Sequence, residues 1–237
     1  MAKRILAFSS SRSGSSGYLE TALPLIKNFL GDKPLQVAFI PFATAGNDYE
    51  VYADNVRTAL KSLPHTITTV NQKDAKNSIE QSDVIMVGGG NTFKLLHDIY
   101  EANILDAIRN KVSSGKPFIG WSAGSNILCP SISTTNDMPI IEPKSFNALG
   151  LFPFQINPHY VNEKPAGHNG ETRDQRLAEF MTMNPGISVV GLPEGTALHL
   201  EDGVLRFIGP QKGLLLYADE NNIRKEITDG EDLSFLL

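Results

Sequence analysis

A serine flanked by glycines, within residues 120–124, is the part of this sequence best suited to chemistry. The five residues read Gly-Trp-Ser-Ala-Gly, which fits the G-x-S-x-G pattern of a nucleophile elbow. They follow an apolar run that ends at Ile119 and precede residues that can begin a helix. A sharp strand-to-helix turn would hold the Ser122 hydroxyl out of the fold, and small neighbours would let the backbone turn tightly. We therefore expect Ser122 to be a nucleophile for acyl transfer.

Main-chain N–H groups near this turn could stabilise the oxyanion that such a reaction forms. The amide of Ala123, directly after the serine, is the natural first donor. A second Gly-rich turn, Gly-Gly-Gly-Asn-Thr, follows another apolar run. Residues without side chains let backbone N–H groups approach a ligand closely, so Gly89 and Gly90 are candidates for the second donor. Asn91 in the same turn is a candidate for contact with the substrate. The turn is not a dinucleotide-binding motif, because Phe93 stands where that motif has its last glycine.

A serine nucleophile also needs a base, and the base needs an acceptor that orients it. Of the five histidines, His159 is the first choice because it follows a predicted strand and a proline at a strand end. His168, also in a predicted loop, is the second choice. Glu194 closes another predicted buried strand, and Asp137 lies in a polar loop from which it could also reach the base. The other histidines lie on or beside predicted helices or in a late strand: His65, His97 and His199.

Apolar runs alternate with helical patterns along the chain, and these predict the elements that must position the candidates. Strands are expected at 4–8, 35–40, 67–70, 83–87, directly before Ser122, and at 152–156, 188–192, 196–200, 203–207, 213–217 and 223–228. Helices are expected at 18–30, 49–62, 93–112 in two segments, and 171–183. The serines and glycines at 9–17 are interpreted as helix caps rather than a phosphate-binding loop.

This alternation predicts an α/β fold, with a mostly parallel twisted sheet covered by helices on both faces, as in flavodoxin, and short C-terminal hairpins. Ligands in such sheets bind beyond the carboxyl ends of the strands. The Gly-rich turns at 88–92 and 120–124 should therefore face one crevice together. A length of 237 residues suits a single α/β domain over residues 1–237.

The composition, 41% hydrophobic and 20% charged, is that of an ordinary soluble globule. The net charge of −5 and the lack of a basic patch argue against nucleic acid as a partner. Apolar runs are too short for a membrane span or a signal peptide, so a cytoplasmic protein without a membrane partner is expected. The single cysteine, Cys129, fits a reducing compartment. It has no partner at metal-ligand spacing and H-E-x-x-H is absent, so neither a metal nor a cofactor is expected.

The chain order Ser122, His159, Glu194 differs from that of α/β-hydrolases, in which the acid precedes the histidine. Several stretches instead resemble the peptidase E family of α-aspartyl dipeptidases: Gly-Gly-Gly-Asn-Thr, Gly-Trp-Ser-Ala-Gly-Ser-Asn, Thr-Thr-Asn-Asp-Met-Pro-Ile, Ala-Leu-Gly-Leu-Phe-Pro-Phe-Gln-Ile-Asn-Pro-His-Tyr, Gly-Glu-Thr-Arg and Gly-Leu-Pro-Glu-Gly. The resemblance covers essentially the whole chain, and the block at 134–160 is long enough to be specific. It implies a fold like class I glutamine amidotransferases, with serine in place of their cysteine. It also implies cleavage of dipeptides with an N-terminal aspartate, in the cytoplasm and without a metal or cofactor.

Matching positions in this resemblance imply that Ser122 is the nucleophile and His159 the base, with Asp137 or Glu194 as the third member. We assign Glu194 to orienting His159, because it ends a buried strand and Pro193 stiffens its approach. Asp137, in an irregular loop where it would be harder to fix, is assigned either to binding the amine of the substrate or to supporting the triad.

The carboxylate of an aspartyl substrate needs a cation or other donors, and arginine can hold a carboxylate through two hydrogen bonds. Arg173 and Arg176 are the candidates. The alternative for both is that they lie on a helix face exposed to solvent and bind no substrate. Two other classes remain open: another acyl-transfer or amidotransferase-like hydrolase, and a non-catalytic binding module of flavodoxin type. The expected partner is a small dipeptide, and the sequence is compatible with a monomer or a homodimer.

Overall fold

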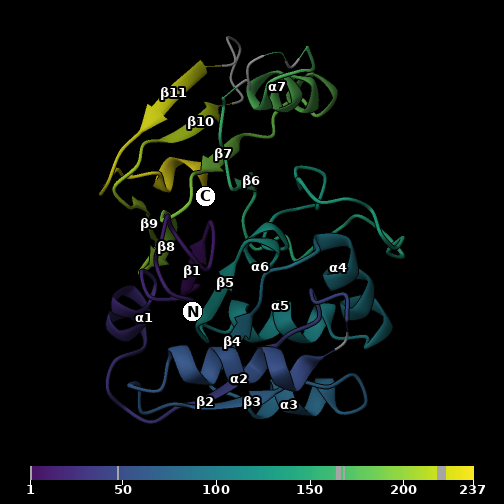
Figure 1. Ribbon diagram of the computed structural model, residues 1–237, viewed down its shortest axis with the longest axis vertical. Helices are drawn as coiled ribbons and strands as arrows, with labels where there is room; N and C mark the ends of the chain where they lie inside the picture. The colour runs from purple at the N-terminus through teal and green to yellow at the C-terminus, as the bar shows by residue number, and fades with distance from the viewer. Residues whose placement is uncertain (1, 47, 164–166, 168, 218–222) are drawn as a thin grey trace.

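The chain folds around a seven-stranded, mostly parallel sheet (Figure 1). The structure is a computed structural model that describes residues 2–46, 48–163, 167, 169–217 and 223–237. The strands of this sheet are β1 (Ile5–Phe8), β2 (Gln36–Ile40), β3 (Thr66–Thr69), β4 (Val84–Val87), β5 (Phe118–Trp121), β8 (Ala197–Glu201) and β9 (Val204–Ile208). They lie in the order β3-β2-β4-β5-β1-β8-β9. The strands from β3 to β1 pair in parallel, and β8 and β9 complete the sheet antiparallel.

Helices cover both faces of this sheet because its central strands are apolar on both sides. The helices are α1 (Leu23–Leu30), α2 (Tyr49–Ala59), α3 (Ala75–Gln81), α4 (Thr92–Glu101), α5 (Leu105–Ser113) and α6 (Ala123–Asn126). On β1, Leu6 and Phe8 pack in a cluster with α1 and α2, whereas Ile5 and Ala7 pack in the cluster that contains α3 to α6. The predicted α/β fold is thus confirmed. Within the described chain, no helix combines the length and apolarity needed to cross a bilayer.

A second, four-stranded sheet carries most of the C-terminal part of the chain (Figure 1). It contains β6 (Gln155–Pro158), β7 (Val189–Leu192), β10 (Gly213–Tyr217) and β11 (Ile223–Ile227), and α7 (Arg173–Met183) lies beside it. The strand order is β11-β10-β7-β6, with only the β6–β7 pair parallel among these described strands. The largest buried cluster includes Ile5 from the first sheet and Val190 from the second. The two sheets therefore share a core.

Two helices differ from the sequence-based expectation. The helix predicted at 18–30 begins only at Leu23, because Leu19 has a φ of 56°, which is left-handed and cannot continue a right-handed helix. The short helix α3 was not predicted. It has seven residues and buries only Ala75 and Ile79, so its apolar pattern is too brief to identify a helix.

The strand predicted at 152–156 lies three residues later, as β6. Phe152 and Phe154 precede the strand and stack on each other in the core, with 4.8 Å between ring centroids. The shift places Pro158 inside the strand and His159 directly after its end. It therefore fixes where the predicted base emerges from the fold.

Candidate active site

Ser122 lies at the turn between β5 and α6, as the sequence predicts. Its φ of 53° and ψ of −115° form a combination that residues other than glycine rarely adopt. The turn is tight: a Cβ added to Gly124 would lie 2.2 Å from the Val87 carbonyl oxygen, and one added to Gly120 would lie 2.4 Å from the Gly124 oxygen. The Ser122 amide donates to the Phe8 carbonyl at 3.1 Å, which ties the turn to β1. Both glycines of the motif are therefore required for the elbow.

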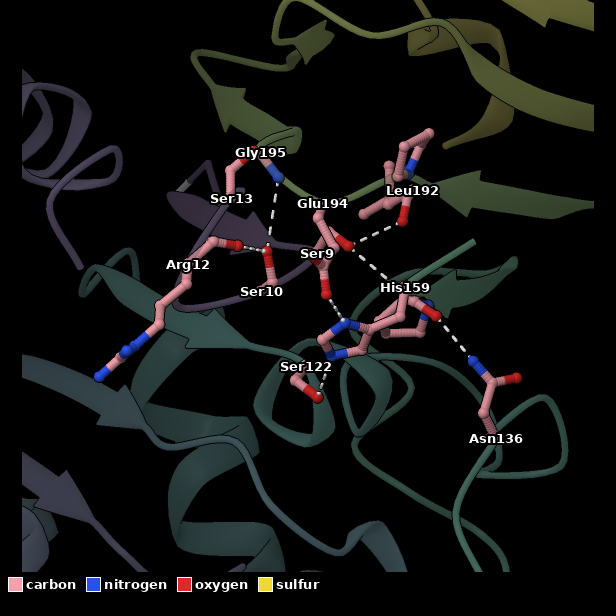
Figure 2. A network of polar contacts seen from close by, with 12 residues as sticks. Ser9, Ser10, Arg12, Ser13, Ser122, Asn136, His159, Leu192, Glu194 and Gly195 are labelled. Atoms are coloured by element: carbon pink, nitrogen blue, oxygen red, sulfur yellow. Dashed lines mark hydrogen bonds and ion pairs between the residues drawn. The ribbon is translucent and has the colours of Figure 1, made fainter. Parts of the chain in front are cut away.

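His159 stands between Ser122 and Glu194 (Figure 2). Its Nε2 lies 2.9 Å from Ser122 Oγ, and its Nδ1 lies 2.9 Å from Glu194 Oε1. The second sheet explains this contact, since β6 and β7 are parallel neighbours in which Pro158 is paired with Leu192. The residues after the two strands consequently leave the sheet side by side. The geometry can relay a proton from the serine to a histidine that is oriented by a carboxylate.

Ser9 joins the two sheets beside the backbone of His159 (Figure 2). Its buried hydroxyl accepts a hydrogen bond from the His159 amide at 2.9 Å and donates to the Leu192 carbonyl at 2.7 Å. His159 has a φ of 52°, so its backbone is in a strained conformation that needs such support. Sequence reasoning interpreted the serines at 9–17 as helix caps and missed this role. The available signal was that Ser9 directly follows β1, the parallel neighbour of β5.

Replacing Ser9 with alanine should lower both stability and turnover. The change leaves the His159 amide without its partner, which typically costs about 1–3 kcal/mol, whereas the Leu192 carbonyl keeps the hydrogen bond from the Tyr160 amide. Urea denaturation should show this loss, and kcat should fall because the histidine backbone is no longer fixed. Ser16→Ala is the matched control, since the Ser16 hydroxyl accepts a bond from the Ser13 amide within its own loop. Wild-type values of both quantities for Ser9→Ala would contradict this role.

Asp137 lies against the N-terminus of α4 and makes no contact with His159. Its Oδ2 accepts hydrogen bonds from the Thr92 amide at 2.7 Å, the Thr92 hydroxyl at 2.6 Å and the Thr135 hydroxyl at 3.2 Å. A negative charge at this position also complements the helix dipole. The expectation that this loop residue would be hard to fix is therefore wrong. Asp137 also lines the cavity beside Ser122, so it can still face a bound molecule.

The three side chains predicted to bind substrate do not line that cavity. Asn91 is the N-cap of α4, and its Oδ1 accepts a hydrogen bond from the Lys94 amide at 3.0 Å. Arg176 is exposed on α7 and forms an ion pair with Glu171, 3.7 Å between Nε and Oε2. Arg173 lies at the start of the same helix, where burial and then the neighbouring Arg176 charge lower the pKa of its guanidinium. The helix begins with the predicted capping box, so local sequence fixes its start.

The other described histidines also lie outside the cavity lining. His97 pairs with the next residue, Asp98, at 3.0 Å. His199 is in β8 of the main sheet, and His65 directly precedes β3. His168, the second candidate for the base, falls outside the described residues. Of the described histidines, His159 is thus the one that the fold brings to the serine.

A cavity of about 690 Å³ opens beside Ser122, within the size range of small-molecule sites. Its lining residues are Ser11, Tyr18, Thr44, Asp48, Val51, Tyr52, Asn55, Gly89, Gly90, Trp121, Ser122, Asp137 and His159. Two carboxylates, Asp48 and Asp137, are among them, and among the described residues no lysine or arginine is. The lining is therefore suited to an amine on the bound molecule.

The three amides predicted to form an oxyanion site are near the serine and available. Gly89 lies against the elbow, because a Cβ added to it would be 3.0 Å from the Ser122 Cβ. Within the described part of the chain, no acceptor binds the amide N–H of Gly89, Gly90 or Ala123. The turns after β4 and β5 thus face one cavity together, as expected from strands that end at the same edge of the sheet.

Known proteins share this arrangement of elements and much of the sequence. The model of peptidase family S51 matches residues 5–208. A relative named peptidase E from Nostoc sp. is 48% identical over 238 residues, covering 100% of this chain and 98% of the relative. A peptidase E from Haemophilus influenzae is also 48% identical, covering 90% of this chain and 99% of the relative.

Two crystal structures share the fold at lower identity. A protein from Listeria monocytogenes EGD-e superimposes with a TM-score of 0.70 at 23% identity, covering 89% of this chain and 100% of that one. A peptidase from an acI-B1 Actinobacterium gives a TM-score of 0.69 at 19% identity, covering 99% and 98%. With a family match over residues 5–208 and relatives of nearly half identity along most of their length, the chain belongs to peptidase family S51.

Proposed function

We propose that this peptidase is a serine dipeptidase that acts in the cytoplasm on dipeptides with an N-terminal aspartate and passes through an acyl-enzyme on Ser122. The observation that carries the proposal is the relay of Ser122, His159 and Glu194 at the side of a cavity of about 690 Å³. Membership of a peptidase family supplies the reaction class. The motifs that resemble α-aspartyl dipeptidases support the preference for aspartate.

In the first half of the reaction, Ser122 Oγ attacks the carbonyl carbon that follows the substrate aspartate. His159 Nε2 takes the serine proton, and the Glu194 carboxylate stabilises the imidazolium that results. The carbonyl oxygen becomes an oxyanion, for which the amides of Ala123 and of Gly89 or Gly90 are the donors. The C–N bond then breaks, and the leaving amine takes the proton from His159.

In the second half, a water molecule attacks the ester that joins the aspartyl group to Ser122. His159 removes a proton from this water and returns it to Ser122 Oγ as the ester bond breaks. Aspartate and the second amino acid are the products.

Recognition of the substrate requires partners for one amine and two carboxylates. We assign the amine to Asp137, whose Oδ2 is already held by α4 and which lines the cavity. For the aspartate side chain, the two arginines predicted from the sequence, Arg173 and Arg176, lie outside the cavity lining. The structure adds Arg12, whose guanidinium lies 5.9 Å from the ring centroid of Tyr18, a lining residue. A cation at any of these positions would distinguish an aspartyl from an asparaginyl substrate.

Among the amidotransferase-like alternatives, an enzyme with a cysteine nucleophile is disfavoured, because the lone cysteine is unsuited to this role. Cys129 is fully buried, and burial raises the pKa of its thiol to about 12, so it stays protonated. Its Sγ accepts a hydrogen bond from the Ile156 amide at 3.0 Å within the core. A non-catalytic flavodoxin-type module, in turn, would have no use for a histidine held between a serine and a carboxylate.

The preference for aspartate predicts that Asp-Leu is cleaved far faster than Asn-Leu. An amide cannot pair with a cation, and leaving one partner of a buried charge pair unmatched costs about 2–5 kcal/mol, roughly 30-fold to several thousand-fold in kcat/KM. Mass spectrometry of a panel of Asp-X, Glu-X, Asn-X and X-Asp dipeptides measures this directly. Equal rates for Asp-Leu and Asn-Leu would rule out a pocket that recognises charge. Cleavage of none of them would contradict the dipeptidase assignment itself.

A further inference from the structure

A chain of hydrogen bonds links the elbow to the Gly-rich turn after β4. The indole Nε1 of Trp121 donates to the Tyr52 hydroxyl at 3.1 Å, and this hydroxyl donates to the Gly89 carbonyl oxygen at 2.9 Å. Trp121 is buried and directly precedes the nucleophile, whereas Tyr52 comes from α2. Three segments that are distant in sequence therefore meet at the Gly89 carbonyl.

The peptide that Tyr52 holds is the one that carries the Gly90 N–H. A trans peptide is planar, so the Gly89 carbonyl and the Gly90 N–H point in opposite directions, and fixing one fixes the other. The described residues include no cis peptide bond. Gly90 lines the cavity with Ser122, and its N–H has no acceptor in the described chain. The orientation of this N–H is thus set by the Tyr52 hydroxyl.

A run of three glycines needs such an anchor from outside. Glycine has no Cβ to restrict its backbone, so a peptide between two glycines can rotate more freely than others. No side chain can stiffen Gly90 itself, because a Cβ there would lie 2.4 Å from the Ala43 carbonyl oxygen, and its φ is 137°. The Asn91 amide donates to the same oxygen at 2.8 Å, which fixes one end of the turn. The Tyr52 hydrogen bond fixes the peptide between Gly89 and Gly90.

We propose that Tyr52, supported by Trp121, is a positioning residue that keeps the Gly90 N–H directed at the oxyanion formed during attack by Ser122. This inference rests on the proposed function, because the oxyanion arises only if Ser122 attacks a carbonyl group. Burial raises the pKa of the Tyr52 hydroxyl, so it keeps the proton that it donates to Gly89. Donation from the indole polarises the hydroxyl further and strengthens its own donation.

The test is steady-state hydrolysis of Asp-Leu by Tyr52→Phe in the full-length protein. Loss of one oxyanion donor typically costs a hundredfold to a thousandfold in kcat. Because this change misdirects the donor rather than removing it, we expect kcat to fall about tenfold to a hundredfold with KM changed less than about twofold. Unchanged kcat, or a rise in KM with kcat preserved, would overturn the role of Tyr52.

Tyr100→Phe is the matched comparison. The Tyr100 hydroxyl also donates to a main-chain carbonyl oxygen, that of Asn147 at 2.9 Å, but Tyr100 does not line the cavity. Its kcat should fall much less than that of Tyr52→Phe. Equal losses in the two variants would mean a general effect on packing and would overturn the inference.

Should Tyr52→Phe fail to fold, Trp121→Phe is the second variant. This variant keeps the hydrogen bond from Tyr52 to Gly89 but loses the one from the indole to Tyr52. We therefore expect kcat to fall less than in Tyr52→Phe, with KM unchanged.

A second readout separates positioning from a loss of folded protein. A boronic acid analogue of aspartate forms a tetrahedral adduct with the serine and places an oxygen in the oxyanion site. Its dissociation constant should rise in Tyr52→Phe by about the same factor as kcat/KM falls, whereas unfolding would leave the affinity of the folded fraction unchanged. An unchanged affinity would overturn the inference. Wild-type protein that cleaves no dipeptide would instead overturn the proposed function, and the oxyanion role with it.

Discussion

Replacing Ser122 with alanine is expected to abolish hydrolysis of Asp-Leu while leaving the protein folded. In the proposed mechanism, Ser122 Oγ forms the first bond to the substrate. Removing the nucleophile of a comparable triad in subtilisin costs about a million-fold in kcat. The side chain contributes little to the fold in the structure. Among the described residues, its side chain makes one hydrogen bond, to His159, whereas the elbow is held by a main-chain contact to β1. Alanine can occupy the same backbone conformation at a similar cost, so the turn should persist.

Three measurements on this variant test the claim together. Turnover of Asp-Leu should fall to background, the midpoint of thermal unfolding should stay close to wild type, and a fluorophosphonate should label the wild type at Ser122 but not the variant. Ser114→Ala is the control, because the Ser114 hydroxyl donates to the Lys111 carbonyl at the end of α5 and Ser114 does not line the cavity. Turnover like that of the wild type in Ser122→Ala would rule out the acyl-enzyme.

The positions of Ser122 and His159 in the site were predictable because each residue has a local signal. The elbow depends on glycines within two residues of Ser122, and His159 directly follows a predicted apolar strand and a proline. The same holds for Glu194, which follows the end of β7 at Leu192 by two residues. Sequence periodicity identifies strands in this way, but it does not say which strand pairs with which. The second sheet was therefore not foreseen, although its β6–β7 pair creates the contact between His159 and Glu194.

The supporting residues could not be predicted for the same reason. Ser9 acts on residues 150 and 183 positions away, and Tyr52 acts on a carbonyl 37 positions away. Such contacts arise from tertiary structure and leave no trace in spacing or composition. Asp137 was foreseen as a functional residue, but its bonds to Thr92 and Thr135 come from the docking of its loop on α4.

Replacing Glu194 with glutamine is expected to lower kcat strongly, because the neutral amide no longer stabilises the histidine cation. In trypsin, neutralising the corresponding aspartate costs about ten-thousand-fold in kcat. That aspartate is buried, whereas the Glu194 side chain is 48% exposed and its partner His159 is 42% exposed. Water screens the charge at such positions, which weakens the interaction. We therefore expect a loss of about a hundredfold or more, smaller than the trypsin value.

Asp137→Asn provides the contrast, since the two carboxylates are assigned different tasks. An amine contact that is equally strong in the ground state and the transition state affects KM more than kcat, so KM should rise in this variant while kcat changes little. Asparagine still offers an oxygen to Thr92, so α4 should keep most of its cap. Steady-state kinetics of both variants on Asp-Leu decide between the assignments. A collapse of kcat in Asp137→Asn, with Glu194→Gln close to normal, would exchange the two roles. It would also mean that the histidine turns away from Glu194 when substrate binds.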